Sequence, residues 1–334
     1  MGTARLTVNL AKITDNTHKT LDICRPFGLD VVGVTKSACG SAAVARAMLA
    51  GGVETLGDSR LDNIARMRDA GVAAKMLLIR SPALSEVEPC IALADGSLNA
   101  DIRVLRALAA EAERTGKTHE VIIMVDLETG REGLLPEDLP IVCCDVAGMK
   151  GLTLRGVGAY FGFQSEAGFH EAGLRRLVAL ARETEKQAGV ALRVISGGST
   201  NVFRTMPLSG KSVEGVNELR IGTAILLGIA SSIGPIRIEG FHQDTFVLEA
   251  EVIEVRRGDR RLAILSLGSL DAEPNHLFPI VPHVSVVSAT NDHTLVDITN
   301  ATPPLRVGDR VSFELGYRAM NRLMLSPYVR VEYR

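Results

Sequence analysis

Lys36 is a candidate for covalent chemistry because of the segment that it ends. It closes the apolar run Val31–Thr35 and is followed by the small residues Ser37–Gly40. An amine that is partly withdrawn from water forms Schiff bases with carbonyl compounds. A lysine at the end of a strand is more often only a solvated charge, so the interpretation of Lys36 depends on the residues that share its site.

Two glycine-containing segments could bind a phosphate group, Ser196–Thr200 and Ile221–Thr223. Glycine lets a ligand approach the backbone N–H groups closely, and hydroxyl groups add further donors. One such segment would be interpreted as a flexible turn, but two at neighbouring strand ends favour phosphate. A phosphate site beside a reactive lysine is what pyridoxal 5'-phosphate (PLP) requires. The residues that we expect to contact the phosphate are Gly198, Ser199, Thr200, Gly222 and Thr223.

Arg220 lies directly before the second of these segments. An ion pair with a glutamate inside the fold would be enough to explain it. If a pyridoxal ring lies between Lys36 and the segment Ile221–Thr223, however, the guanidinium of Arg220 would lie near the pyridine nitrogen. Because a guanidinium only donates hydrogen bonds, it would leave that nitrogen unprotonated. The weaker electron sink that results suits simple proton exchange at Cα.

The pattern of apolar and helical segments along the chain predicts the scaffold that positions these residues. Over the first two-thirds of the chain, short apolar segments alternate with amphipathic helical ones, which is typical of a parallel sheet buried on both faces. A count of eight favours a closed (β/α)8 TIM barrel, whose active site lies at the carboxyl ends of the strands. The expected strands are 30–35, 53–56, 75–79, 96–98, 120–126, 154–161, 191–196 and 218–222, and the expected helices include 41–50, 61–70, 101–115 and 166–188.

The pattern changes after Gly234-Pro235, where strand-like runs and Gly/Asp/Pro turns replace the helices. This predicts two domains, a barrel over residues 1–235 and a smaller all-β domain over residues 236–334. The segment Arg5–Leu10 also has strand character and could pair with the β domain. A short helix is expected near Arg318–Leu323.

Composition excludes several classes of protein. The 334 residues carry 37 Lys and Arg against 39 Asp and Glu, a net charge of −2 that argues against a nucleic-acid partner. Ile221–Ile236, the longest uncharged run, is too short and too interrupted to span a membrane, and no hydrophobic secretory segment is visible near Met1. Five cysteines without CxxC spacing predict neither a disulfide framework nor a zinc ribbon. We therefore expect a cytoplasmic protein, in a compartment that keeps its cysteines reduced.

Several segments resemble the fold-type III PLP-dependent enzymes, and among them the alanine/ornithine racemase group, over nearly the whole chain. The resemblance implies that Lys36 binds PLP covalently and that Arg220 faces the pyridine nitrogen. It also implies that Arg131 lies close to the phenolic oxygen of the cofactor and to the substrate carboxylate. The segments that carry it are 32–36 with 39–40, 56–60, 124–133, 195–200, 219–228, 292–297 and 326–329.

Four positions depart from the family pattern. Alanine racemases carry a tyrosine as the second proton-transfer residue in a Gly-Tyr-x-Asp-like motif, whereas this chain has Gly-Ser-Leu-Asp at Gly268–Asp271. Met124 replaces a lysine of the alanine racemases, and Gly40 replaces an aromatic residue. The missing tyrosine and Met124 argue against alanine as the substrate. Thr223 replaces a glutamate of the ornithine racemases, which weakens the case for an ornithine-like ammonium group.

The resemblance implies an amino-acid racemase in which Lys36 serves one face of the substrate. For the other face the candidates are Asp271, Tyr317, Ser269 and an ordered water. It also implies a homodimer, in which the β domain of the partner completes each barrel mouth. The alternatives are a lyase or decarboxylase of the same fold, or a PLP-binding protein with weak turnover. His293 has no clear second ligand, so we expect a hydrogen-bonding role for it and no metal site.

Overall fold

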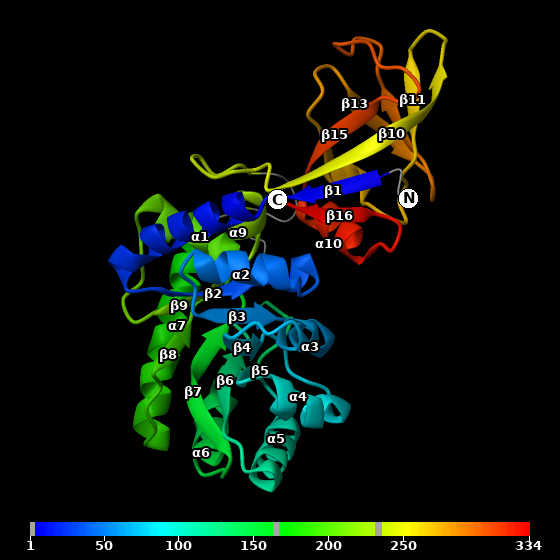
Figure 1. The fold of residues 1–334 in the computed structure, drawn as a ribbon. Helices are drawn as coiled ribbons and strands as arrows, with labels where there is room; N and C mark the ends of the chain where they lie inside the picture. Colours follow the sequence, from blue (N-terminus) through cyan, green and yellow to red (C-terminus); the bar gives the residue numbers. More distant parts are fainter. Residues whose placement is uncertain (1–3, 128, 163–166, 231–235) are drawn as a thin grey trace. The chain divides into compact units, whose positions relative to one another are not determined.

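A computed structural model describes residues 4–127, 129–162, 167–230 and 236–334 (Figure 1). The chain forms two compact units. The barrel unit contains residues 17–36 and 40–222, and the β unit contains the described residues of 1–16, 37–39 and 223–334. Helix α1 (Leu10–Cys24) contributes residues to both.

The barrel unit contains the eight parallel strands that the sequence predicts. They close into a barrel in the order β2-β3-β4-β5-β6-β7-β8-β9, which confirms the TIM-barrel fold. Each expected strand segment overlaps one observed strand, including the short one that begins at Gly96. The strands are β2 (Asp30–Val34), β3 (Thr55–Asp58), β4 (Lys75–Leu78), β5 (Gly96–Asn99), β6 (His119–Val125), β7 (Leu152–Ala159), β8 (Val194–Ser196) and β9 (Glu218–Ile221).

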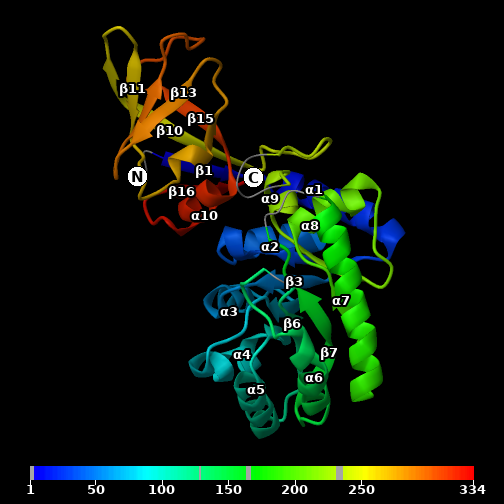
Figure 2. The same ribbon diagram turned by 180° about the vertical axis from the view of Figure 1, so that it is seen from behind.

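The barrel helices lie outside the strands (Figure 2). Two helix ends are capped: Ser41 Oγ accepts from the backbone N–H of Val44 at the start of α2, and Gly116, at φ 65°, follows α5. The predicted start of one helix, Glu166, lies outside the described residues. The helices are α2 (Ala42–Ala50), α3 (Leu61–Asp69), α4 (Val87–Leu93), α5 (Ile102–Thr115), α6 (Leu139–Ala147), α7 (Ala167–Ala188) and α8 (Thr200–Thr205).

The interior of the barrel is filled by side chains at alternate positions of the strands. Two layers follow from this alternation. Close to the amino ends lie the charged residues Lys75, Glu120 and Glu218, each in the first two positions of its strand. Above them lies a buried apolar cluster, which consists of Val32, Leu77, Leu98, Ile122, Met124 and Val194.

The β unit is built around antiparallel strands, which confirms the expected all-β C-terminal region. Its strands follow the path β12-β15-β10-β11-β14-β13, and β1 pairs antiparallel with β10 and parallel with β16. The expected short helix is present as α10. Its elements are β1 (Ala4–Val8), α9 (Thr223–Leu227), β10 (Phe246–Arg256), β11 (Leu262–Leu265), β12 (Leu277–Pro279), β13 (Ser285–Ala289), β14 (Thr294–Asp297), β15 (Arg310–Leu315), α10 (Tyr317–Leu325) and β16 (Arg330–Tyr333).

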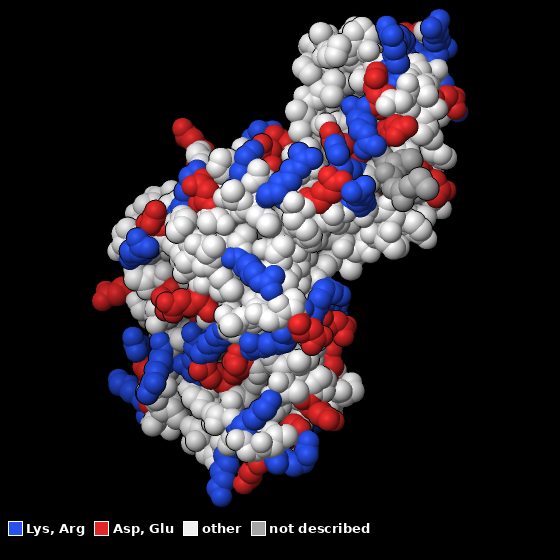
Figure 3. Space-filling view, viewed as in Figure 1, with Lys and Arg blue, Asp and Glu red and all other residues white. Residues whose placement is uncertain are grey.

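The predicted domain boundary stays a prediction, because Gly234-Pro235 lies outside the described residues. None of the described helices is long and apolar enough to cross a membrane. On the face drawn in Figure 3, basic and acidic side chains are interspersed, in keeping with the net charge of −2.

Candidate active site

Lys36 lies two residues after the end of β2, and the residue between them, Thr35, is fixed to the neighbouring strand. Thr35 Oγ1 donates to Asp58 Oδ2, the last residue of β3, at 2.8 Å. The other oxygen of Asp58 accepts from the backbone N–H of Arg60 and from Asn63 Nδ2, both at 3.0 Å. Burial raises the pKa of Asp58, and the hydrogen bonds from Thr35 and Asn63 oppose that rise. Asp58 therefore anchors the backbone that carries Lys36.

Arg220 is buried inside the barrel, where acceptors on two other strands hold its guanidinium. Its Nη1 donates to Ser196 Oγ and its Nη2 to the carbonyl oxygen of Ala159 at 3.0 Å. Ser196 Oγ in turn donates to Glu218 Oε1 at 2.8 Å. Burial lowers the pKa of Arg220, and the charge of Glu218 opposes this effect. The barrel glutamate considered from the sequence is thus present, and Ser196 bridges it to Arg220.

Arg131 is held by an aromatic ring and a carboxylate. Its guanidinium carbon lies 3.8 Å from the centroid of the Tyr160 ring, and its Nε is hydrogen-bonded to Glu132. Tyr160 directly follows the residue of β7 whose carbonyl oxygen accepts from Arg220. Arg131 and Arg220 thus contact consecutive residues, Tyr160 and Ala159, and the charge of Arg131 lowers the pKa of Arg220. Met124, in place of the lysine of alanine racemases, is buried in the barrel.

In the turn after β8, the backbone at Gly198 packs too closely against its neighbours to allow a side chain. Gly198 adopts φ 110°, and a Cβ at this position would lie 2.9 Å from Val202 and 3.2 Å from Phe161. Ser199 precedes α8 and Thr200 begins it. The first N–H groups of a helix have no acceptor within the helix, so those of this turn are available to a ligand.

The turn after β9 likewise has little room for a side chain at its glycine, Gly222. A Cβ at Gly222 would lie 3.1 Å from both Cβ and the carbonyl oxygen of Val34, which ends β2. Gly222 is therefore next to the strand that leads to Lys36. Arg220, two residues earlier, donates from its backbone N–H to the carbonyl oxygen of Gly198 at 2.9 Å, which ties the two turns together. Thr223 begins α9.

The three residues considered for the second face, Ser269, Asp271 and Tyr317, belong to the β unit, whereas Lys36 belongs to the barrel unit. Asp271 Oδ1 accepts from Ser326 Oγ at 2.5 Å. Tyr317 begins α10, and Arg322 of the same helix donates to the carbonyl oxygen of Ser269 at 2.7 Å. The structure therefore places all three β-unit candidates on adjoining elements.

No group of three or more His, Cys, Asp and Glu side chains in the described part of the chain could hold a metal ion. His293 is exposed, and its carbonyl oxygen accepts from the backbone N–H of Thr290 at 2.8 Å.

Four residues of this site were not assigned a role from the sequence: Asp58, Tyr160, Ser196 and Glu218. For one of the four, Glu218, a pattern in the sequence could have indicated its role. Glu218 and Arg220 are charged residues at alternate positions of a short strand, which places both side chains on one face. Tyr160 carries no comparable pattern, and neither does the link from Asp58 to Thr35, because in both cases the partner comes from another part of the chain.

Known proteins resemble this chain over its full length. It is 28% identical to an ornithine racemase of Acetoanaerobium sticklandii, over 98% of this chain and 99% of the relative. It is 30% identical to a lysine racemase of Thermotoga maritima, over 98% of both chains. An alanine racemase structure from Corynebacterium glutamicum has a TM-score of 0.77 at 16% identity, over 100% of both chains. A D-threonine aldolase structure from Filomicrobium marinum has a TM-score of 0.79 at 18% identity, over 96% of this chain and 88% of the other.

The family model described as alanine racemase, N-terminal domain, matches residues 8–229. This range contains the whole barrel, Lys36, Arg131, Arg220 and both glycine turns. The chain therefore belongs to the alanine racemase N-terminal domain family.

Proposed function

We propose that this protein is a PLP-dependent racemase that interconverts L- and D-amino acids. The observation that carries the proposal is the convergence of four features at the carboxyl edge of one barrel. Lys36 follows β2, Arg131 and Arg220 both contact the end of β7, and Gly198 with Gly222 forms the two restricted turns. The relatives named ornithine racemase and lysine racemase, which the chain matches from end to end, support this activity.

The residues of the barrel edge fit PLP. Gly198 has a positive φ, and its contacts with Val202 and Phe161 leave no room for a side chain, so this turn presents bare backbone of the kind that suits a phosphate group. Ser199, Thr200, Gly222 and Thr223 would complete the phosphate contacts. Arg220, already oriented by Ser196, would donate to the pyridine nitrogen, and Lys36 would bind the aldehyde carbon. When bound, PLP supplies an electron sink that makes the Cα proton of an amino acid acidic.

The protein's own residues would then position the substrate and move protons. Lys36 would take the proton from Cα on one face or return it there. Arg131 would bind the α-carboxylate, held in place by Tyr160 and Glu132. Retention of that carboxylate in an ion pair disfavours loss of CO2. The proton on the opposite face would be moved by a residue of the β domain, for which Asp271 and Tyr317 remain the candidates.

We further propose that the protein is a homodimer, in which the β domain of one protomer completes the barrel mouth of the other. Three large apolar side chains support an interface here, Leu270, Leu325 and Tyr328, which are 67%, 72% and 76% exposed. They flank the hydrogen-bonded pair of Asp271 and Ser326 in the sequence. In sedimentation, Leu270→Asp should shift the protein toward the monomer and lower its activity. A fully active monomer of the unmodified protein would contradict the dimer.

We also propose that the protein is cytoplasmic. All five cysteines are free thiols, which suits a reducing compartment.

The racemase proposal is tested by turnover in D2O with a panel of L- and D-amino acids. Deuterium should appear at Cα in both enantiomers of the substrate. Lys36→Ala should abolish this exchange, and it should also remove the absorbance of covalently bound PLP. Release of CO2, or of glycine and an aldehyde, would show a decarboxylase or lyase instead.

A further inference from the structure

A chain of alternating charges extends from Arg220 through the barrel interior. Ser196 connects Arg220 to Glu218, and Arg155 Nη2 lies 3.1 Å from the other oxygen of Glu218. Arg155 Nε lies 3.5 Å from Glu120 Oε2. The sequence of groups thus alternates positive and negative, and Ser196 is its one neutral member among the contacts described.

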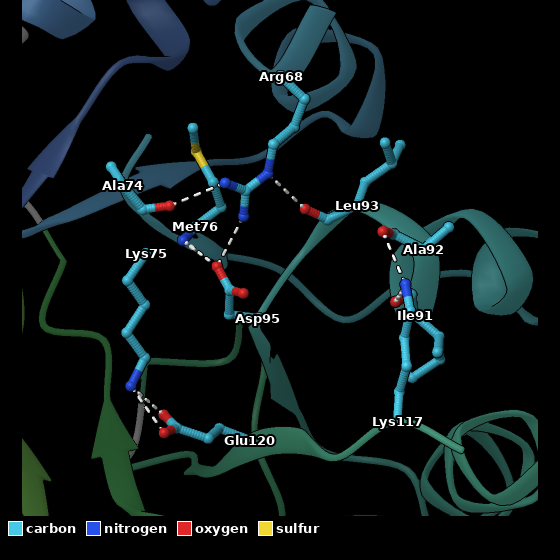
Figure 4. Close-up of polar contacts among 10 residues, drawn as sticks. All are labelled: Arg68, Ala74, Lys75, Met76, Ile91, Ala92, Leu93, Asp95, Lys117 and Glu120. Carbon is cyan, nitrogen blue, oxygen red and sulfur yellow. Dashed lines mark hydrogen bonds and ion pairs between the residues drawn. The ribbon is translucent and has the colours of Figure 1, made fainter. Parts of the chain in front are cut away.

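The far end of this chain lies at the amino ends of the strands, as Figure 4 shows. Lys75 Nζ contacts both oxygens of Glu120, at 2.7 and 2.6 Å. Nearby, Arg68 is anchored separately, by Asp95 Oδ2 at 2.7 Å and by two backbone carbonyl groups. Lys75 and Glu120 are about one-third exposed, whereas Glu218 and Arg220 are buried. Solvent therefore screens the outer pair, and the inner members depend on one another.

The inner contacts determine both the orientation and the charge balance of Arg220. Its two Nη atoms donate to acceptors on different strands, Ser196 of β8 and Ala159 of β7, which fixes the plane of the guanidinium. Its charge is buried, and the nearest carboxylate in this chain of contacts, Glu218, is reached through the Ser196 hydroxyl. β8 and β9 are in register at Ser196 and Glu218, so the backbone itself sets this alignment.

We propose that Ser196 and Glu218 are positioning residues for Arg220, and that together they set how strongly Arg220 donates to the pyridine nitrogen of PLP. Ser196 fixes the direction of the guanidinium, and Glu218 moderates its positive charge. This inference rests on the proposed function, since it concerns the group that Arg220 would contact.

Substitutions of the two residues should have opposite effects on one measurable quantity, the 15N chemical shift of ring-labelled PLP bound to the protein. Ser196→Ala removes the bridge, so the hydrogen bond from Arg220 weakens and the resonance moves toward that of an unbonded pyridine nitrogen. Glu218→Gln can still accept from Ser196 but has lost its charge. Arg220 then becomes a stronger donor, and the resonance moves in the other direction. Ser196→Ala should also release PLP about tenfold faster, as expected for one lost hydrogen bond.

Glu120→Gln is the matched control. It disturbs the same chain of charges through Arg155 and Lys75, and it should lower stability while leaving the 15N shift as in the unmodified protein. If Glu218→Gln fails to fold, the nearly isosteric Ser196→Ala is compared with Glu120→Gln. The inference then requires a changed 15N shift in Ser196→Ala and an unchanged one in Glu120→Gln.

Three results would overturn the inference: an unchanged shift in Ser196→Ala, shifts of the same sign in Ser196→Ala and Glu218→Gln, or an equal shift in Glu120→Gln. These are distinct from failure of the proposed function. If the protein does not bind PLP, the unmodified protein shows no resonance of bound PLP and both proposals fall, whereas a PLP-dependent lyase or decarboxylase would retain the resonance and overturn only the racemase reaction.

Discussion

Arg131 lies over the ring of Tyr160, with its guanidinium carbon 3.8 Å from the ring centroid. A guanidinium above an aromatic face is attracted by the negative face of the π system, and the attraction also restricts where the cation can move. In this chain Met124 replaces the lysine that alanine racemases carry seven residues before the matching arginine. The stacking on Tyr160 and the contact with Glu132 therefore keep Arg131 in place here.

Tyr160→Ala should weaken substrate binding more than it slows the chemical step. Loss of a cation–π contact of about 1 kcal/mol should raise KM about fivefold, because Arg131 must then be ordered by the substrate itself. Tyr160→Phe keeps the ring and should leave KM nearly unchanged. Steady-state kinetics in both substrate directions would check this, and an equal rise of KM in the two variants would exclude the stacking as the cause.

Gly198→Ala should impair binding of PLP. The new Cβ would meet Val202 at 2.9 Å, and the backbone would be held at φ 110°, at a cost of about 1–3 kcal/mol. We expect the affinity for PLP, measured by spectrophotometric titration of the apoprotein, to fall about tenfold or more. Gly210→Ala is the matched control, since Gly210 also has a positive φ (72°) but has open space around it. Comparable losses of affinity in the two variants would point to backbone strain alone.

Asp58→Ala should destabilise the barrel edge that carries Lys36. It would leave the buried Asn63 amide without its acceptor and would leave the Thr35 hydroxyl only its longer contact, 3.3 Å, with the carbonyl oxygen of Gly57. This should lower the free energy of unfolding by about 2–4 kcal/mol. Covalent attachment of PLP to Lys36 should also be slower, as stopped-flow absorbance would show. Asp58→Asn retains one acceptor oxygen and should have the smaller effect on both. If Asp58→Ala attached PLP at the normal rate, Asp58 would be only a structural residue.

His119 should make the stability of the protein depend on pH. Burial lowers its pKa from 6.5 to about 4, and its Nε2 lies 2.8 Å from Ser97 Oγ. Since the folded-state pKa is below the unfolded one, the unfolded chain takes up the proton first. The stabilisation by neutral His119 is therefore complete above pH 6.5 and is lost as the pH falls toward 4, by about 2 kcal/mol between pH 7 and pH 5.

Denaturant titrations of His119→Gln at the two pH values would check this prediction. The variant lacks the titrating ring, so its stability should fall less between pH 7 and pH 5 than that of the unmodified protein, by about the same 2 kcal/mol. Identical losses in the two proteins would assign the acid sensitivity to other groups.

The sequence by itself predicted the barrel, which the structure confirms, and the candidate site residues. Alternation of apolar strands with helices follows from local hydrophobic periodicity, which a single chain displays directly. The glycines at positions 198 and 222 could likewise be identified, because only a few residue types tolerate such close backbone contacts. Lys36, Arg131 and Arg220 stand in motifs whose resemblance to a known family extends along the chain.

Only the tertiary structure decided how these residues are held. Tyr160 contacts Arg131 because the end of β7 and the segment after β6 meet at one edge of the barrel. No pattern in the sequence between the two residues predicts that contact. Glu218 acts on Arg220 through Ser196, a residue of another strand, and this requires the register between β8 and β9. Side-chain contacts between strands depend on how the sheet closes, and closure is a property of all eight strands together.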